Sequence, residues 1–403
     1  MAVRPNKNSA RPKDRHQGSP HRFKNTEPDM DRESKFEARS RNNFNILRVV
    51  AASLVVLSHG YELPTGLAQH DWAFYFTGRA LSWYAVNLFF VISGYLIFVS
   101  WERNPSPLSF FWARFLRIFP GLFVMLVTTV LVLGASFSTL PFLQYIVDYR
   151  TIQYLLGCLS VIAVRYELPG VFVDNPSEAV NGSLWTLRYE VFCYVCVAAV
   201  GMTGLLRVQR RRMGFLVAGI LASSLALIFL DIRGLHPSEG KLAMAYELAR
   251  LTLCFQLGGL YSDLRHRLPL KFMVVVGLLA VMVASVETPL FAPVASIAVA
   301  YAAMWFAFVP DGEWIAWTRS APDYSYGIYI YAFPIQQALI AAMPAVSPLS
   351  TFALGFCMTL VPAALSWHFV ERPAITHKQL RSLQARTKWS EPLASSSNGK
   401  SPG

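Results

Sequence analysis

The sequence has few charged residues for its length. Only 15% of its 403 residues are Asp, Glu, Lys or Arg, whereas a soluble globular protein carries about a quarter. Apolar runs of about 20 residues recur through most of the chain, and each is long enough to cross a bilayer core. The runs are continuous and do not alternate, which argues against a β-barrel. We therefore predict an all-α, polytopic membrane helix bundle.

Cysteine is also scarce, and its pattern does not favour redox or metal chemistry. Cys193 and Cys196 form a CxxC motif, a spacing found in redox and zinc sites. The motif lies inside the apolar stretch "VFCYVCVAAV", with no second pair and no histidine nearby. Small thiol side chains suit helix packing. We favour that structural role and predict no metal site.

The formal net charge of +12 raises two alternatives, a polyanionic partner or membrane orientation. Residues 1–43 hold eleven Lys and Arg against six acidic residues and almost no aliphatic ones, so we expect a disordered tail and no signal peptide. Much of the other positive charge lies in short connections, where it orients helices by the positive-inside rule. We expect the lipid bilayer, and no nucleic acid, as partner.

Eleven apolar segments are candidate membrane helices. They cover approximately residues 44–62, 82–101, 120–138, 152–165, 185–204, 214–230, 246–261, 271–286, 291–309, 324–343 and 349–369. The basic clusters at 114–117, 207–212 and 265–271 are all expected in the cytoplasm. With the N-terminal tail also cytoplasmic, these clusters can share one side of the membrane only if one segment between residues 138 and 185 does not cross. The short segment 152–165 is best explained as a half-helix on the outer side. About ten transmembrane helices with both termini cytoplasmic follow.

Three parts of the chain follow from these patterns. The integral-membrane domain is expected to cover residues 44–373, between the tail at 1–43 and a polar cytoplasmic tail at 374–403.

An arginine and a histidine enclose the apolar interior of the first segment, "RVVAASLVVLSHG". Arg48 and His59 are three helical turns, about 16 Å, apart and project to the same side of a helix. Ionisable groups in membrane helices normally face a bundle interior or a water-filled cavity. We expect one cavity, with Arg48 near its cytoplasmic end and His59 near its outer end.

Two further groups of charges are ambiguous by spacing alone. Arg114 and Arg117, just before the third segment, are explained either as topology signals or as a phosphate clamp, and spacing favours the former. Glu190 follows an Asn-Gly turn at the start of the next crossing segment. It is either a surface carboxylate at a helix N-terminus or a group that orients or charges His59.

Two polar residues are candidates for acceptor binding. Arg188 has no obvious local partner, and Gln336 lies deeper than the tyrosines of "YSYGIYIYAFPIQQ", which suit a membrane interface. The charges of "SWHFVERP" are interpreted as a structural cluster.

Six segments recur together in a known order. They are "RVVAASLVVLSH", "FFVISGYLI", "RFLRIFP", "GSLWTLRYEVF", "YSYGIYIYAFPI" and "SWHFVERP", and they span residues 44–373. This set resembles the acyltransferase 3 family, integral-membrane enzymes that O-acetylate bacterial surface polysaccharides and related glycans. The resemblance implies a multi-pass protein of the bacterial cytoplasmic membrane, an acyl-CoA donor (acetyl-CoA first), a glycan acceptor and no permanently bound cofactor.

The resemblance also implies roles for the charged residues. His59 would be the essential base and Arg48 a functional partner, while Arg114 and Arg117 would engage the donor, which reverses the preference from spacing. Glu190 could stabilise the His59 imidazolium, as a carboxylate does in a hydrolase triad. An acyl-histidine intermediate and direct transfer stay open.

This chain departs from the family pattern at two positions. Ala332 stands where many members carry a histidine, and Arg188 stands where small residues or proline are common, which could reflect acceptor choice. Two other functions are alternatives: a transporter or flippase of a glycan or lipid precursor, and a non-catalytic scaffold or receptor. Against transport, the segments show no inverted repeat, and the polar groups cluster at the two faces.

Overall fold

The computed structural model describes residues 42–67, 71–234, 240–265 and 267–376. The predicted tails at 1–43 and 374–403 therefore fall almost entirely outside the described residues.

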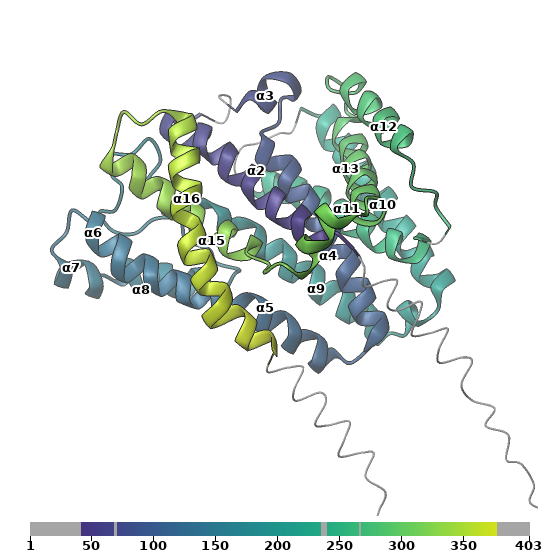
Figure 1. The fold of residues 1–403 in the computed structure, drawn as a ribbon, viewed down its shortest axis with the longest axis horizontal. Coiled ribbons are helices and arrows are strands. Elements are labelled where there is room, and N and C mark those ends of the chain that lie inside the picture. The colour runs from purple at the N-terminus through teal and green to yellow at the C-terminus, as the bar shows by residue number, and fades with distance from the viewer. Residues whose placement is uncertain (1–41, 68–70, 235–239, 266, 377–403) are drawn as a thin grey trace, which may run out of the picture. The chain divides into compact units, whose positions relative to one another are not determined.

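The described part is mainly helical and forms no β-strand, as predicted. Its helices (Figure 1) are α2 (Phe44–Thr65), α3 (Trp72–Thr77), α4 (Leu81–Arg103), α5 (Pro107–Thr128), η2 (Thr129–Gly134), α6 (Ala135–Phe137), α7 (Phe142–Val147), α8 (Tyr149–Leu159), η3 (Gly182–Thr186), α9 (Leu187–Met202), η4 (Leu205–Arg207), α10 (Gln209–Ile232), α11 (Gly240–Leu264), α12 (Phe272–Ala284), α13 (Phe291–Phe308), α14 (Glu313–Ser320), α15 (Ser325–Ala342), α16 (Pro348–Ser366) and η5 (Trp367–Glu371).

Seven helical stretches of the described residues are long and apolar enough to cross a membrane. They are Phe44–Thr65, Leu81–Arg103, Pro107–Phe137, Gly182–Met202, Gln209–Ile232, Phe291–Phe308 and Pro348–Thr376. Helices α11, α12 and α15 lie at the positions of the other three predicted crossings but are not among these seven, so the number of about ten stays a prediction. Helix α8 has 11 residues, about 16 Å, and agrees with the expected half-helix. The polytopic helix bundle is therefore confirmed.

The predicted start of the third segment, at residue 120, is wrong. Helix α5 begins at Pro107, and Pro120 lies inside it. A proline is tolerated at the first helical position, where its missing N–H has no partner to lose, and Pro107 occupies that position. Arg114 and Arg117 therefore belong to the body of a helix and not to a loop before it.

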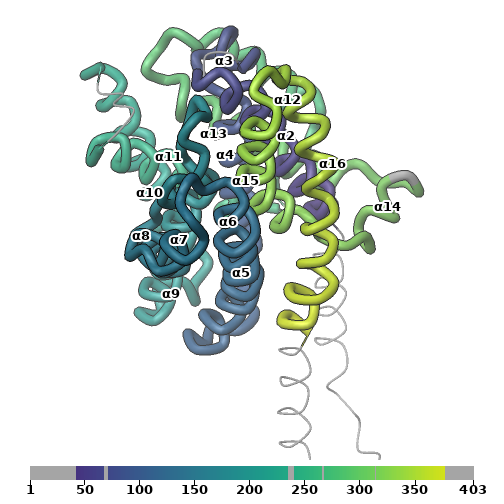
Figure 2. Tube along the Cα trace, turned by 90° about the vertical axis from the view of Figure 1, so that its left-hand side faces the viewer, coloured from purple at the N-terminus to yellow at the C-terminus, as the bar shows by residue number. Residues whose placement is uncertain are grey.

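Helices α2 and α4 form the centre of the bundle. Helix α2 contacts α4, α15 and α16, while α4 also contacts α9, α11 and α13. Figure 1 shows α2 and α4 between the pair α15–α16 and the group α10–α13, and Figure 2 shows α10 and α11 on the side of α4 away from α16. The charged residues of α2 consequently face other helices.

A close helix contact joins α4 to α11 through two glycines. A Cβ added to Gly94 would lie 1.9 Å from the carbonyl oxygen of Phe255, and one added to Gly258 would lie 2.0 Å from that of Val91. Small residues allow membrane helices to approach this closely. The contact fixes the position of α4, which carries much of the cavity wall described below.

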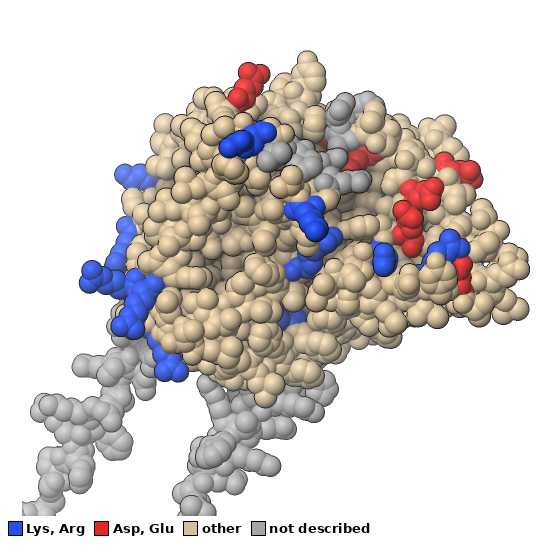
Figure 3. Space-filling view, turned by 180° about the vertical axis from the view of Figure 1, so that it is seen from behind, with Lys and Arg blue, Asp and Glu red and all other residues tan. Residues whose placement is uncertain are grey.

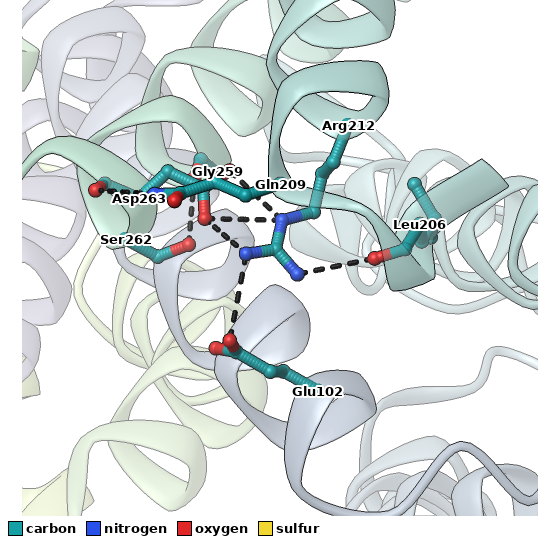
Figure 4. Close-up of polar contacts among 7 residues, drawn as sticks. All are labelled: Glu102, Leu206, Gln209, Arg212, Gly259, Ser262 and Asp263. Carbon is teal, nitrogen blue, oxygen red and sulfur yellow. Dashed lines mark hydrogen bonds and ion pairs between the residues drawn. The ribbon is translucent and has the colours of Figure 1, made fainter.

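A buried ion pair joins three helix ends at one face of the bundle. Arg212 at the start of α10 binds Asp263 near the end of α11, reaches Glu102 near the end of α4 at 3.5 Å, and donates to the carbonyl of Leu206 (Figure 4). The adjoining connections carry Arg207, Arg210 and Arg211, and also Arg267 and Lys271, all exposed. We call this end of the bundle the basic face.

The visible charges support a division between two ends. Figure 3 shows Lys and Arg side chains gathered along one lower edge, whereas most acidic side chains on that view lie higher or to the right. Helix α4 runs from Leu81 to Glu102 at the basic face, about 31 Å at 1.5 Å per residue. That length matches a bilayer core of about 30 Å. The position of a residue along α4 therefore indicates its depth between the two ends of the bundle.

Substitution of Gly258 by alanine is expected to destabilise the bundle. The new Cβ would collide with the α4 backbone, and overpacking of this kind costs about 1–3 kcal/mol. Gly277→Ala in α12 is the matched control, because its Cβ would meet nothing within 4 Å and alanine favours a helix interior. Thermal unfolding of the two proteins in detergent measures the difference. Equal melting temperatures would contradict the packing described here.

Candidate active site

A cavity of about 340 Å³ lies among α2, α4, α5, α9 and α15. Its polar lining residues are Arg48, Ser93, Arg114, Arg117, Thr186, Glu190, Tyr194, Ser325, Tyr326 and Tyr329. Along α4 the lining extends from Val86 to Ile97, about 16 Å of depth. Ile375, near the end of the helical stretch Pro348–Thr376, also contributes. The cavity thus occupies the middle of the bundle and approaches the basic face.

Two of the arginines share one carboxylate. Arg48 Nη1 and Arg117 Nη2 each lie 2.8 Å from Oδ2 of Asp323, in the turn before α15. Burial raises the pKa of Asp323, but the two guanidiniums outweigh that and hold its pKa well below the ordinary range. Asp323 therefore stays ionised, and the stability it contributes is lost only when the pH falls below the ordinary carboxyl range.

The third arginine has no carboxylate partner. Arg114 forms no ion pair with any described residue, and its Nε is buried without a hydrogen-bond partner. Its guanidinium lies 5.8 Å from the ring centre of Phe110 and 5.9 Å from that of Tyr194. Aromatic faces accommodate a cation but leave its N–H donors free. Arg114 is therefore the cavity cation best placed to accept an external anion.

Glu190 lies in the cavity wall with two hydroxyl groups. Its Oε1 accepts a short hydrogen bond from Tyr194 and lies 3.4 Å from Oγ of Ser93. Within the described residues no hydrogen bond joins Glu190 to His59. The structure thus brings Glu190 together with the arginines of the cavity, and not with the histidine.

His59 lies outside the cavity lining, beyond its far end. The imidazole packs edge-on against Phe333, with ring centres 5.0 Å apart. Its Nδ1 is buried and has no partner in the part of the chain that is described. Phe333 follows Tyr329, a lining residue, by four positions, so both lie on the same face of α15 one turn apart. About one helical turn separates the cavity from the histidine.

A buried aspartate anchors the region around His59. Asp71 is 1% exposed and accepts hydrogen bonds from Ser58 Oγ at 2.5 Å and from the backbone N–H groups of Ala73 and Leu81. These contacts tie the outer part of α2 to the starts of α3 and α4. Because Leu81 begins α4, His59 lies at the end of the bundle opposite the basic face.

The two candidates for acceptor binding make structural contacts. Arg188 donates to the carbonyl of Trp185 and to the hydroxyl of Tyr166 at 2.9 Å. Gln336 is fully buried and donates to the carbonyl of Val56 on α2, while its Oε1 has no partner among the described residues. Neither side chain lines the cavity. Their roles in acceptor binding stay predictions.

Several cavity residues were not predicted from the sequence. Tyr194 and Thr186 of the lining were missed, as was Asp323, which binds two of the cavity's arginines, and Ser93 is notable only within "ISGY". One signal could have identified Asp323. The predicted topology puts the connection 310–323 in the cytoplasm, yet this connection carries more acidic than basic residues. A carboxylate that binds buried arginines explains this departure from the positive-inside pattern.

The fold and the cavity define the class of protein: an integral-membrane helix bundle with a cationic cavity inside it. Residues 41–368 match the family model of the acyltransferase domain, acyltransferase 3, and the chain belongs to this family. Two relatives are an "O-acetyl transferase" of Shigella phage Sf6, 27% identical, and "Nodulation protein 10" of Rhizobium leguminosarum bv. viciae, 31% identical. The matches cover 83% and 86% of this chain and 96% of each relative. No solved structure matches the chain significantly.

The family and the relatives establish the activity class. The protein is an O-acyltransferase with a membrane-embedded catalytic domain. The predicted resemblance is therefore confirmed, and transport or a purely structural role is not needed to explain the buried charges.

Proposed function

We propose that the protein transfers an acyl group, acetyl first, from cytoplasmic acyl-CoA to a hydroxyl of a cell-surface or lipid-linked glycan. The observation that carries the proposal is the arrangement along the bundle. Three arginines line a cavity near the basic face, and His59 lies one turn beyond its far end. The name of the phage relative supports acetyl as the group transferred.

The arginine end suits the nucleotide part of the donor. The phosphates of acyl-CoA are anionic, and guanidinium groups bind phosphate oxygens in a fixed fork geometry. Arg114 brings donors that no described carboxylate occupies. The exposed arginines of the basic face support a cytoplasmic orientation of this end by the positive-inside rule. In this proposal the protein lies in the bacterial cytoplasmic membrane and takes acyl-CoA from the cytoplasm.

The apolar depth of the cavity suits the pantetheine arm. At the far end, Phe89 and Tyr329 contact each other with ring centres 5.6 Å apart. The Tyr329 hydroxyl is held by Thr186 and by the carbonyl of Ser183, each at 2.8 Å. We infer that this aromatic pair lies between the cavity and His59, because Tyr329 lines the cavity one turn before Phe333, on which His59 packs. Transfer therefore requires Tyr329 to move aside when the thioester arrives.

The chemistry assigned to His59 is general-base catalysis. Its imidazole would accept the proton of a glycan hydroxyl as the oxygen attacks the thioester carbonyl, and the CoA thiolate would leave and take up a proton. A general base of this kind contributes about 10²–10⁴-fold to the rate. For Glu190 to stabilise the imidazolium, it must approach His59 in a conformation other than this one.

Replacement of His59 by alanine is expected to abolish glycan acylation. The surface glycan of a strain lacking the gene is compared with that of strains restored by wild type, His59→Ala or His368→Ala. Proton NMR of the purified polymer reports O-acetyl groups, which should fall about 100-fold or more for His59→Ala because the base is lost. His368→Ala is the matched control, since His368 bonds Tyr324 at the opposite end of the bundle.

Three outcomes separate the alternatives. Full acetylation with His59→Ala, at wild-type protein level, would show that the histidine is structural. A strain that lacks surface glycan altogether, while its lipid-linked precursor accumulates, would favour the flippase. An acetylated glycan that does not depend on the gene would remove this acceptor from the proposal.

Neutralisation of Arg114 is expected to weaken donor binding. Loss of one charge-assisted hydrogen bond costs about 1.5–3 kcal/mol, which is roughly a ten- to hundredfold rise in Kd. Calorimetric titration of the detergent-purified protein with CoA measures the Kd of Arg114→Gln and of the control Arg150→Gln. Arg150 is exposed and paired with Asp148 outside the cavity. An unchanged Kd for Arg114→Gln would place the phosphates elsewhere.

A further inference from the structure

Asp323 connects three parts of the chain that are distant in sequence. Its Oδ2 accepts from Arg48 on α2 and Arg117 on α5, and its Oδ1 accepts from the N–H and hydroxyl of Ser325 in the first turn of α15. Both carboxylate oxygens are therefore used. Because Ser325 holds Oδ1, the carboxylate has a fixed orientation toward the two arginines.

The two arginines retain donors for a ligand. A guanidinium has five N–H groups, and Asp323 takes one from each arginine in the closest contacts. The side chains of Arg48 and Arg117 are 23% and 19% exposed, whereas that of Asp323 is 8% exposed. Both arginines line the cavity, and Asp323 does not. The carboxylate thus lies behind the guanidiniums, on the side away from the cavity.

This arrangement overcomes the repulsion between two cations. Without the carboxylate, guanidiniums that meet on one oxygen would repel each other and separate into alternative rotamers. A ligand would then have to order two long side chains as it binds, and this cost lowers affinity. With the carboxylate in place, the arginines are ordered before the ligand arrives.

We propose that Asp323 is a positioning residue for donor binding: it orients Arg48 and Arg117 so that their free N–H groups, together with Arg114, form a preorganised site for the phosphates of CoA. The inference rests on the proposed function, because it deepens the assignment of the cavity to acyl-CoA. Asp323 itself does not touch the donor.

The test uses a variant for which the charge of the cavity and the positioning of its arginines predict opposite changes in CoA affinity. Asp323→Asn makes the cavity more positive, so charge alone predicts tighter binding of CoA. Positioning predicts the reverse, a rise in the Kd of about tenfold or more. Calorimetric titration with CoA measures the Kd, and thermal unfolding of the same samples confirms the fold. A Kd that is unchanged or lower, in a protein that melts like wild type, would overturn the proposal.

Two further variants separate positioning from a structural role. In Asp323→Asn combined with Arg117→Gln, the loss of CoA affinity should be smaller than the sum of the two single losses, because Asp323 acts partly through Arg117. Asp323→Glu keeps the charge but displaces it, and its Kd should lie between those of wild type and Asp323→Asn. Additive losses in the double variant would overturn the proposal. So would a wild-type Kd for Asp323→Glu, which decides the matter if Asp323→Asn does not fold.

A matched control and the wild type complete the experiment. Asp263→Asn removes the other buried carboxylate that binds an arginine, Arg212, outside the cavity, and its CoA affinity should equal that of wild type. If wild type itself shows no CoA binding, the proposed donor fails. If wild type binds CoA and Asp323→Asn binds it equally well, only the role of Asp323 fails.

Discussion

Pairing of buried charge at the Asp323 carboxylate is the interaction on which the cavity depends. Charges in a membrane bundle must be paired or hydrated, and a single carboxylate satisfies Arg48 and Arg117 from two different helices. The start of α15 supplies the carboxylate, so α2, α5 and α15 are held together at the same depth. Arg114 lies on the same helix as Arg117 but has no such partner among the described residues. The structure thereby separates arginines that are ordered in advance from the one that is free to bind.

The depth of the bundle relates this cationic end to the chemistry. Helix α4 extends from the basic face, marked by Glu102 and Arg212, to Leu81, which is bonded to Asp71 beside His59. A donor that entered from the basic face would meet arginines first and hydroxyl groups next. In the proposed path the ring pair of Phe89 and Tyr329 follows, and His59 lies beyond it. Access across the bilayer then needs movement of a side chain rather than of whole domains.

Much of this arrangement could be predicted from the sequence, because apolar length and family motifs are local patterns. The helices came from such patterns, and so did the choice of Arg48, Arg114 and Arg117 as candidates, all of which line the cavity. His59 was expected in the same cavity but lies outside its lining. Contacts between distant segments could not be predicted. Asp323 looks like a loop acid until α2 and α5 are placed beside it. Glu190 was expected near His59, but its partner is Tyr194, four residues further along α9, a local spacing that the sequence does contain. The start of α5 was misplaced at residue 120, whereas the helix begins at Pro107.

The most direct test of the central claim is an experimental structure of the protein with bound CoA in a lipid nanodisc. It would locate both ends of the ligand at once. The account predicts that the phosphates contact Arg114 with Arg48 or Arg117, and that the thiol points past a displaced Tyr329 toward His59. Phosphates bound elsewhere, or a thiol directed away from His59, would contradict it.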